Sequence, residues 1–333
     1  MVQIRPKVVS YFKDTFNRYI GTGKMQLIFS LLFIATLPFI AMFLQKYGDI
    51  VELRRKERPD YPWPEYSELW IAVYSCAVLI GLNLAFKRCF FGYAGSLLKD
   101  KYKGDERENR QKRMVDCMLK TVYFCVAAVA GYCVAKNADF LPPAMGGGGV
   151  SSNIHVDFPF QSFEKLPYLK EYIMMQLGYH LHSLILHVAK PPRNDFMEML
   201  LHHVMTVFLI GLAYFMNYHV YSILVLIAHD IPDVFVCLAK MFVDTKYTTA
   251  ALISCTLMVT SWAHLRLCAF PAHVIWNCFY DNPIYDETYG VSLLSSMLHI
   301  LLVLDTYWFF LFMKMGYHFA VKKEAQDLQQ KLE

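Results

Sequence analysis

The stretch FMEMLLHHVMTVFLIGLAYFMNYHVYSILVLIAHDIPDVFVCLAKMF, residues 196–242, decides the fold of this chain. It holds two apolar runs joined by a short polar turn, and each run has about the 20 residues that a helix needs to cross a bilayer. The first run carries adjacent His202 and His203, and the second carries the motif HDIPD, which begins at His229. An ionisable side chain at the bilayer centre costs about 2.5–3.5 kcal/mol, so such residues are expected to face a polar site inside a helix bundle.

The composition of the whole chain supports membrane-spanning helices. Of its 333 residues, 56% are hydrophobic and 18% are charged, and the mean hydropathy is +0.30. Soluble domains usually have about 25% charged residues. We therefore predict an all-α, polytopic transmembrane helical bundle of about eight spans, because a helix satisfies its own backbone polar groups in lipid. The predicted spans are Met25–Leu44, Leu69–Phe86, Met114–Ala135, Ile173–Ala189, Phe196–Met216, His219–Phe242, Thr248–Cys268 and Val291–Met315.

Lysine and arginine are unevenly distributed between the loops. With the N-terminus in the cytosol, the segments on that side hold 22 of the 32 basic residues and the opposite side holds 8. The remaining two, Lys120 and Arg266, lie inside predicted spans. Because cytosolic loops are enriched in these residues, we predict that both termini face the cytosol.

Basic residues at the predicted cytosolic ends have two interpretations. The segment 99–113 is a topology signal, with contact to anionic lipid or to the phosphates of CoA as the alternative. Lys190 and Arg193 are either topology signals or phosphate ligands. On the opposite side, the glycine tract within 144–152 predicts a flexible turn.

Titratable side chains in four predicted spans lie at similar depth. Counting about 1.5 Å per residue from the cytosolic end of each span places them roughly 10–20 Å into the bilayer. We therefore predict a partly hydrated cavity in the cytosolic half of the membrane, where these side chains meet. They are His180 and His182 in the fourth span, His202 and His203 in the fifth, His229, Asp230 and Asp233 in the sixth, and Asp305 in the eighth.

These residue types suit acid–base or nucleophilic chemistry. Histidine titrates near neutral pH and can serve as base, acid or nucleophile. A carboxylate beside it fixes the tautomer and stabilises the imidazolium. His202 and His203 project about 100° apart on a helix, so both can border one pocket but in different roles.

Structural roles compete with functional ones at several positions. For His180, His182 and His299, an interhelical hydrogen bond is the favoured interpretation. Asp195 directly precedes an apolar run, so an N-cap is at least as good an interpretation as a substrate contact. Arg266 is expected near the non-cytosolic end of its span, with its side chain extending to the membrane surface.

A metal site is a rival explanation for the histidines. Membrane di-iron enzymes need several clusters such as H-x-x-H-H or H-x-x-x-H, but Met199 and Glu198 occupy the positions three and four before His202. A mononuclear zinc site could be assembled, yet no spacing demands one. We predict no metal.

Residues 193–242 resemble the Lag motif of ceramide synthases, within the TLC-domain family. The shared pattern is D-F-x-E-M-x-x-H-H-x-x-T, followed by H-D-x-x-D and a closing A-K. The resemblance extends through GYHLHSLILH (178–187), SWAHLRLCAFP (261–271) and LLVLDTYWFFLFMKM (301–315). It divides the chain into a cytosolic N-terminal segment with two additional spans (1–104), a TLC domain (105–320) and a cytosolic tail (321–333).

The resemblance implies a multi-pass enzyme of the endoplasmic reticulum membrane that transfers a fatty acyl group from long-chain acyl-CoA to the amine of a sphingoid base. About six helices would surround an acyl cavity that opens to the cytosol. No cofactor is implied besides acyl-CoA as co-substrate, and no nucleic-acid partner. Membrane lipid, a second copy of the chain or a small regulatory membrane subunit are the implied partners.

The resemblance implies that His202 and His203 are catalytic and that Asp230 and Asp233 match essential acidic positions, and the full set of predicted site residues is wider. The predicted catalytic residues are His202, His203, His229, Asp230 and Asp233. The predicted substrate- or CoA-binding residues are Lys190, Arg193, Asp195, Tyr179, His180 and Asp305. In the predicted mechanism, His202 attacks the thioester, His203 or His229 handles the proton and Asp230 orients the base, with His203 an equal candidate for the nucleophile.

One position departs from the family pattern, and two other functions stay open. Pro232 stands in the H-D-x-S-D stretch, and proline removes a backbone donor and kinks a helix. A non-enzymatic TLC-domain protein, lipid-sensing or translocon-associated, is the first alternative, and the retained H-H and H-D pairs argue against it. A transporter is the second, and the absence of an internal repeat argues against it. Neither the acyl chain length nor the identity of the sphingoid base follows from the sequence.

Overall fold

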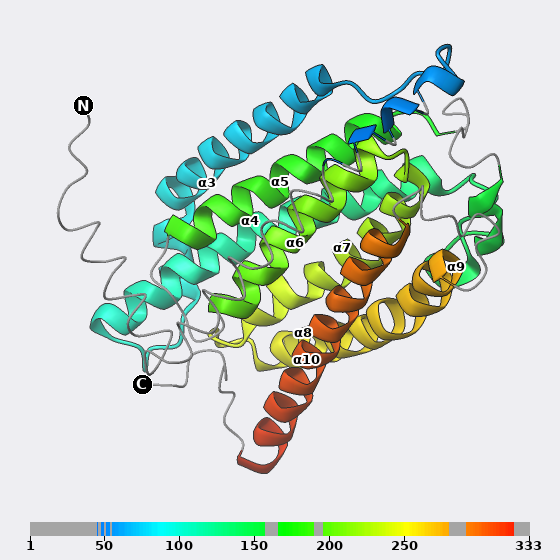
Figure 1. Cartoon of the computed structure of the whole chain (residues 1–333). Coiled ribbons are helices and arrows are strands. Elements are labelled where there is room, and N and C mark those ends of the chain that lie inside the picture. Colours follow the sequence, from blue (N-terminus) through cyan, green and yellow to red (C-terminus); the bar gives the residue numbers. More distant parts are fainter. Residues whose placement is uncertain are drawn as a thin grey trace, which may run out of the picture.

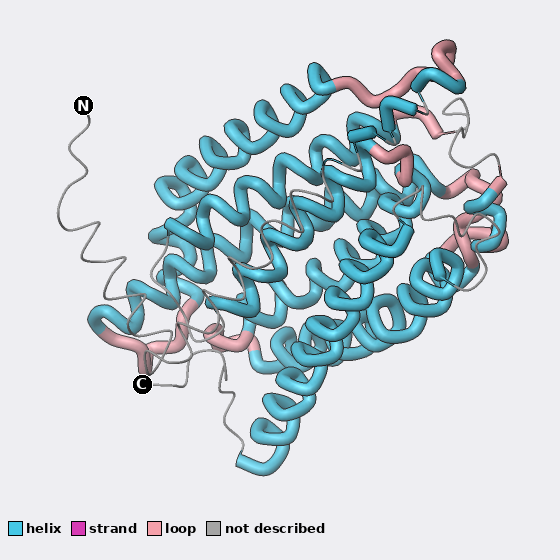
Figure 2. The backbone as a smooth tube through the Cα atoms, viewed as in Figure 1, coloured by secondary structure: helices cyan, strands magenta, loops and turns pink. Residues whose placement is uncertain are grey.

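The computed structural model describes residues 55–156, 166–189, 196–279 and 291–322, together with a few residues between 45 and 53. Within these ranges the chain is a bundle of helices, and its only strand-like pairing is a bridge between Leu98 and Thr245 (Figures 1 and 2). The long helices are α3 (Leu69–Leu97), α4 (Gly104–Ala135), α5 (Leu169–Ala189), α6 (Phe196–Phe215), α7 (His219–Phe242), α8 (Thr248–Trp262) and α10 (Val291–Lys322). The short elements are η1 (Tyr66–Glu68), η2 (Pro143–Met145), η3 (Ser151–His155), η5 (Ala263–Ala269), η6 (Pro271–Ile275) and α9 (Trp276–Phe279).

The predicted all-α membrane bundle is confirmed. Six described segments are long and apolar enough to cross a membrane: α3 with η1, α4, α6, α7, α8 with η5 and η6, and α10. The predicted fourth span corresponds to α5, which is a helix but is not among these six. The predicted first span, Met25–Leu44, lies outside the described residues.

Successive long helices run in opposite directions, so the connections collect at two ends of the bundle (Figure 1). The loops 98–103 and 243–247 meet at one end, where Leu98 pairs with Thr245. The segment 136–156 and the turn 216–218 lie at the other end (Figure 1). Because the helices share these two ends, residues predicted at the same depth, such as His180, His202 and His229, lie at a similar level of the bundle.

The helices α4 to α8 and α10 surround an interior space. α7 packs between α4 and α8, α5 packs against α6, and α10 contacts both α6 and η5. α3 packs outside this ring against α4 and α5. The approach of α5 to α3 depends on Gly178, because a Cβ atom there would lie 2.5 Å from the backbone oxygen of Ala72.

The segment 136–156 forms a hydrogen-bonded cap, where a flexible turn was expected. The Gly149 N–H donates to the carbonyl of Leu141 at 2.8 Å, and the Val150 N–H donates to that of Asp139 at 2.8 Å. A Cβ atom on Gly149 would stand 2.2 Å from the Asp139 oxygen, so this tight return needs glycine. The glycine tract therefore serves close backbone contact, and Leu141 beneath it is fully buried.

Helices extend past the predicted spans at the end that carries the loops 98–103 and 243–247. α3 runs to Leu97 and α4 begins at Gly104, because helix formation continues beyond the apolar stretch. Pairs at spacing four, such as Arg110 with Glu106 at 2.9 Å, support the charged first turns of α4. Apolar content marks the lipid-crossing part of a helix and not its ends.

A buried carboxylate joins the two loops at this end. Asp244, 1% exposed, accepts hydrogen bonds from Arg113, from Arg110 at 2.5 Å and from the Tyr102 hydroxyl at 3.4 Å. Burial and then the Asp244 carboxylate raise the pKa of Tyr102, which keeps its hydroxyl protonated as a donor. Lys99 also donates to the carbonyl of Val243 at 2.8 Å.

Candidate active site

Two cavities lined by the described residues lie inside the helix ring. The apolar chamber has an empty volume of about 720 Å³ and is lined mainly by aliphatic side chains of α6, α7 and α10, such as Leu209 and Leu298. The polar chamber has an empty volume of about 1180 Å³ and is lined by charged residues of α4, α7 and η5 together with aromatic ones. Four residues line both chambers and define the neck between them: His180, His202, Asp233 and Arg266.

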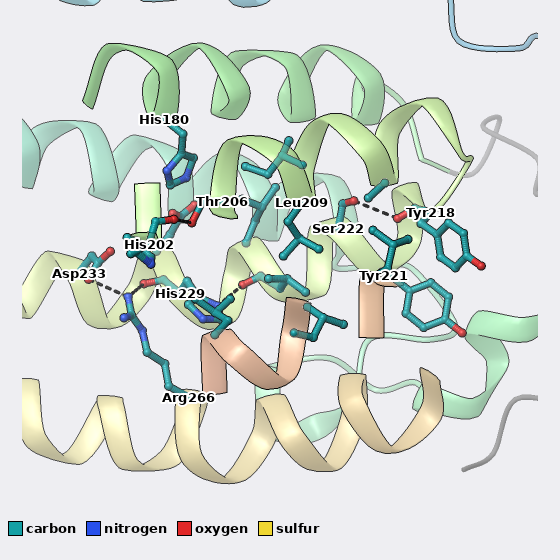
Figure 3. A pocket seen from close by; sticks show the side chains of 18 residues that line it. His180, His202, Thr206, Leu209, Tyr218, Tyr221, Ser222, His229, Asp233 and Arg266 are labelled. Carbon is teal, nitrogen blue, oxygen red and sulfur yellow. Dashed lines mark hydrogen bonds and ion pairs between the residues drawn. The ribbon is translucent and has the colours of Figure 1, made fainter. Parts of the chain in front are cut away.

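An arginine stands at the centre of the charged residues around the neck. Arg266, 3% exposed, bonds Asp233 at 2.7 Å and Asp305 at 3.1 Å, and donates to the carbonyl of His229 at 2.8 Å. Its guanidinium also lies 3.8 Å from the ring centre of Trp262. Buried charges persist where they are paired and hydrogen-bonded. Arg266 thus joins α7, η5 and α10 at the level of the neck, and Figure 3 shows its contacts with α7.

His229 is held at both ring nitrogens. Its Nδ1 lies 2.7 Å from the carbonyl of Val225, and its Nε2 lies 3.1 Å from Oδ2 of Asp305. Both partners are acceptors, so both nitrogens donate together only in the imidazolium form.

His202 has its ring nitrogens available. Its side chain makes no hydrogen bond to any residue in the described part of the chain, and its buried Nδ1 lacks a partner. The ring lies 5.2 Å from that of Trp308 and 5.5 Å from that of His203. Because His202 lines both chambers and its Nδ1 has no partner, it has the geometry expected of a nucleophile.

His203 occupies a different position from His202. It lines the polar chamber and not the apolar one, and its ring lies 5.3 Å from that of His187. The expected divergence of adjacent helical residues is therefore observed. The geometry favours His202 over His203 as the residue that reaches both chambers.

Asp230 belongs to a separate hydrogen-bond network. Its Oδ2 accepts hydrogen bonds from Gln176 and from the Tyr172 hydroxyl at 3.2 Å, and Gln176 in turn accepts one from Tyr123 at 2.6 Å. Its other oxygen accepts no hydrogen bond from the described residues, and Asp230 lines the apolar chamber. The expected pairing of Asp230 with the base is not observed, because Asp305 occupies that position at His229.

The polar chamber carries cationic side chains toward the end with the loops 98–103 and 243–247. Lys120 and Lys240 line it, half-buried, and neither makes an ion pair or hydrogen bond within the described residues. Arg113 lines it as well while bound to Asp244. These positive charges suit an anionic ligand such as a phosphate.

Most of the residues predicted for the site converge. His180 lines both chambers, and no hydrogen bond reaches its buried Nδ1, which contrasts with the expected interhelical bond. Tyr179 lines the polar chamber and stacks on Tyr123 at 3.8 Å. Their roles in catalysis and binding stay predictions. The predicted residues Lys190, Arg193 and Asp195 lie outside the described residues.

The expectation for Arg266 was wrong. The depth count assumed that its span ends at Cys268, but the helix continues through η5 and η6 to α9, so Arg266 lies deep in the bundle. A lone arginine in an apolar run opposite two aspartates in other spans was the signal that could have found it. Gln176 and Tyr172 were missed too, although their spacing of four places them on one helix face.

The histidines were also considered from the sequence as possible metal ligands, and their arrangement in the structure bears on that alternative. Across residues 55–156, 166–189, 196–279 and 291–322, no group of three or more His, Cys, Asp or Glu side chains is arranged to hold a metal ion.

Pro232, the departure from the family pattern, lies buried inside α7, and the helix continues through it to Phe242.

Comparison with known proteins identifies relatives. The family model of the TLC domain matches residues 113–314. Ceramide synthase hyl-2 of Caenorhabditis elegans is 23% identical over 291 residues, which is 82% of this chain and 85% of that protein. The ASC1-like protein of Solanum lycopersicum is 30% identical over 244 residues, 69% of this chain and 76% of that protein. Ceramide synthase 4 of Mus musculus is 22% identical over 305 residues, 89% of this chain and 73% of that protein.

Proposed function

The chain belongs to the TLC-domain family, and from this membership and the geometry of the site we propose that it is a ceramide synthase. It transfers a fatty acyl group from acyl-CoA to the amine of a sphingoid base. The observation that carries the proposal is the neck, where His202 borders an apolar chamber on one side and a cationic, polar chamber on the other.

The two chambers match the two parts of acyl-CoA. The CoA moiety carries phosphates and suits the polar chamber with Lys120 and Lys240. The fatty acyl chain suits the aliphatic walls of the apolar chamber. With the substrate placed in this way, its thioester lies at the neck beside His202.

The first step forms an acyl-imidazole on His202. A ring nitrogen attacks the thioester carbonyl, a C–N bond forms and the C–S bond breaks. The ring proton of His202 passes through His229 to the departing thiolate. Asp305 and Arg266 hold His229 for this exchange, so they act as positioning residues.

The second step releases the amide. The sphingoid amine attacks the acyl carbon, the new amide C–N bond forms and the bond to His202 breaks. The amine proton passes to the nitrogen of His202, with the unoccupied oxygen of Asp230 as the carrier. Covalent chemistry in two steps suits a site that keeps water from the acyl group.

The cellular setting belongs to the same proposal. The chain is a multi-pass membrane protein, and we place it in the endoplasmic reticulum with both termini and the polar chamber facing the cytosol, where acyl-CoA is delivered. The loops 98–103 and 243–247 then form part of the cytosolic face. Acyl-CoA is the only co-substrate proposed, with no separate cofactor, and a second copy of the chain or a small membrane subunit is the proposed protein partner.

Enzyme activity in cells that lack ceramide synthase tests the function. Membranes containing the wild-type chain receive labelled acyl-CoA and a sphingoid base, and labelled ceramide is measured. We expect ceramide from the wild type and from Tyr74→Ala, whose side chain is 72% exposed on α3, and none from His202→Ala. A wild-type chain that binds lipid but never forms ceramide would falsify the assignment.

Intact mass measurement tests the mechanism separately. After incubation with acyl-CoA alone, the wild-type protein and His203→Ala should gain the mass of one acyl group, and His202→Ala should not. An adduct that persists in His202→Ala places the nucleophile on another residue, even if ceramide synthesis itself is observed.

A further inference from the structure

The apolar chamber ends at two tyrosines. Tyr218 and Tyr221 line its far end and are 2% and 4% exposed. Tyr221 precedes His229 by eight residues on α7, which places it about 12 Å farther along the helix axis. Figure 3 shows both rings at the end opposite His202 and Asp233, with their hydroxyls turned away from the chamber.

Tyr221 is tied to the cap segment 136–156. Its hydroxyl lies 3.0 Å from Nδ1 of His155, the last residue of η3. The hydroxyl of Ser151, at the start of η3, lies 3.0 Å from Nδ1 of His273 in η6. The cap is therefore fastened both to α7 and to η6, and this attachment fixes where the ring of Tyr221 stands.

The orientation of bound acyl-CoA determines which part of the acyl chain reaches the ring of Tyr221. If CoA occupies the polar chamber and the thioester carbon reaches His202, the hydrocarbon beyond that carbon must continue through the neck into the apolar chamber. Leu209, Ile210 and Leu298 form its walls on α6 and α10. The methyl end of the chain is then directed toward Tyr218 and Tyr221.

We propose that Tyr221, held by His155, limits the length of the acyl chain that the protein transfers. This inference rests on the proposed function. An acyl chain that fits places its terminal methyl group against the ring of Tyr221, and a longer chain is rejected because it would overlap the ring. Removing the ring opens space next to the buried cap, and interior side chains close such space only in part.

A competition assay with a mixture of acyl-CoAs tests the proposal. Membranes containing wild type, Tyr221→Ala, Tyr221→Leu or Tyr221→Phe receive equal amounts of saturated acyl-CoAs of graded length and one sphingoid base, and ceramides are separated by mass. Because one methylene in an apolar pocket changes discrimination by about 10-fold or more, Tyr221→Ala should raise the share of chains two to four carbons longer by at least about 10-fold. Tyr221→Leu should shift the profile less, which keeps the test independent of whether the alanine variant folds.

The Tyr221→Phe variant separates the effect of the ring from that of its hydrogen bond. Tyr221→Phe keeps the ring and loses the bond to His155, so a smaller shift in the same direction is expected. Tyr74→Ala on the outer face of α3 serves as the control and should retain the wild-type profile.

The outcomes distinguish this inference from the proposed function. If Tyr221→Ala and Tyr221→Leu make ceramide with the wild-type acyl profile, the inference is overturned and the function stands. If they change the preferred chain length of the sphingoid base instead, the apolar chamber holds the base and the inference is again overturned. A wild-type chain that forms no ceramide rejects the function itself.

Discussion

At the scale of single residues, the contacts of His229 determine how it can act. Asp305 lies at its Nε2 and a backbone carbonyl at its Nδ1, so the ring is held in one orientation. Asp305 is fully buried and also bonds Arg266. One carboxylate therefore positions both His229 and Arg266 beside the neck.

We predict that Asp305→Asn lowers kcat by about 10²- to 10⁴-fold with little change in KM for acyl-CoA, because the amide keeps the shape but not the charge that stabilises the imidazolium. Steady-state kinetics in membranes measures both constants. Asp100→Asn, whose side chain is 87% exposed in an ion pair with Lys246, is the control and should keep the wild-type kcat. An unchanged kcat in Asp305→Asn would show that His229 does not need the carboxylate.

The ion pairs of Arg266 lead to a prediction about the thermal stability of the protein. Removing one partner of a buried ion pair costs about 3–5 kcal/mol, because the other charge stays buried without compensation. Arg266→Leu should therefore lower the thermal midpoint in detergent strongly, and Arg266→Lys should lower it less, since lysine keeps the charge but lacks the planar fork of donors. Lys112→Ala breaks an exposed pair with Glu108 and should change the midpoint little. Equal midpoints for wild type and Arg266→Leu would contradict the paired arrangement.

At the scale of helices, close approach between α5 and α3 rests on one glycine. At Gly178, a methyl group would meet the Ala72 carbonyl at 2.5 Å, and Ser75 lies as near at 2.6 Å. Backbone atoms cannot move aside as a flexible side chain can. The contact between α3 and the helix ring therefore depends on the absence of a side chain at this position.

We predict that Gly178→Ala lowers the thermal midpoint, because α3 must move outward and loses packing. Gly81→Ala is the matched control: it lies in α3 with nothing within 4 Å of the new Cβ atom, and alanine favours a helix over glycine by about 0.5–1 kcal/mol. Gly81→Ala should thus equal or exceed the wild type in the same thermal assay. A Gly178→Ala protein as stable as Gly81→Ala would mean that α3 and α5 are not in close contact.

The sequence predicts elements better than their ends. The apolar runs predicted all seven of the described long helices, since a bilayer demands long apolar segments. The shared depth of His180, His202 and His229 follows from helix rise alone, and the three residues meet at the chambers as expected. The sequence after Arg266 has no clear helix-ending residue at the predicted boundary, Cys268, and the helix continues to α9. The predicted depth of Arg266 was therefore wrong.

The hydrogen-bond partners of Asp230 and Asp305 could not be predicted from the sequence, for a different reason. Depth along a helix is one coordinate, but contact also needs the rotation of each helix about its axis and the identity of its neighbour. Asp230 faces Gln176 and Tyr172 of α5, whereas His229, one residue earlier, faces Asp305 of α10. Only the packed bundle defines these faces.

At the scale of the whole molecule, the loops divide into two sets at opposite ends, and this arrangement makes the orientation testable. Tyr247 is 55% exposed beside the loops of the proposed cytosolic face, and Val150 is 61% exposed in the cap at the other end. Each is open to a water-soluble reagent on its own side.

We predict that in sealed microsomes a membrane-impermeant maleimide labels Tyr247→Cys above the background of the wild-type chain, and labels Val150→Cys only after the membrane is permeabilised. Cytosolic loops enriched in lysine and arginine are the physical reason. Labelling of Val150→Cys in sealed microsomes would reverse the orientation and put the polar chamber on the side without acyl-CoA.

The neck has a consequence for how a detergent-like molecule travels through the protein. If the polar chamber faces the cytosol as proposed, the polar chamber, the neck and the apolar chamber follow one another in the same order as water, headgroups and tails in the cytosolic leaflet. An amphiphile would then enter lengthwise without inverting, and only its hydrocarbon part would pass the charged residues around Arg266.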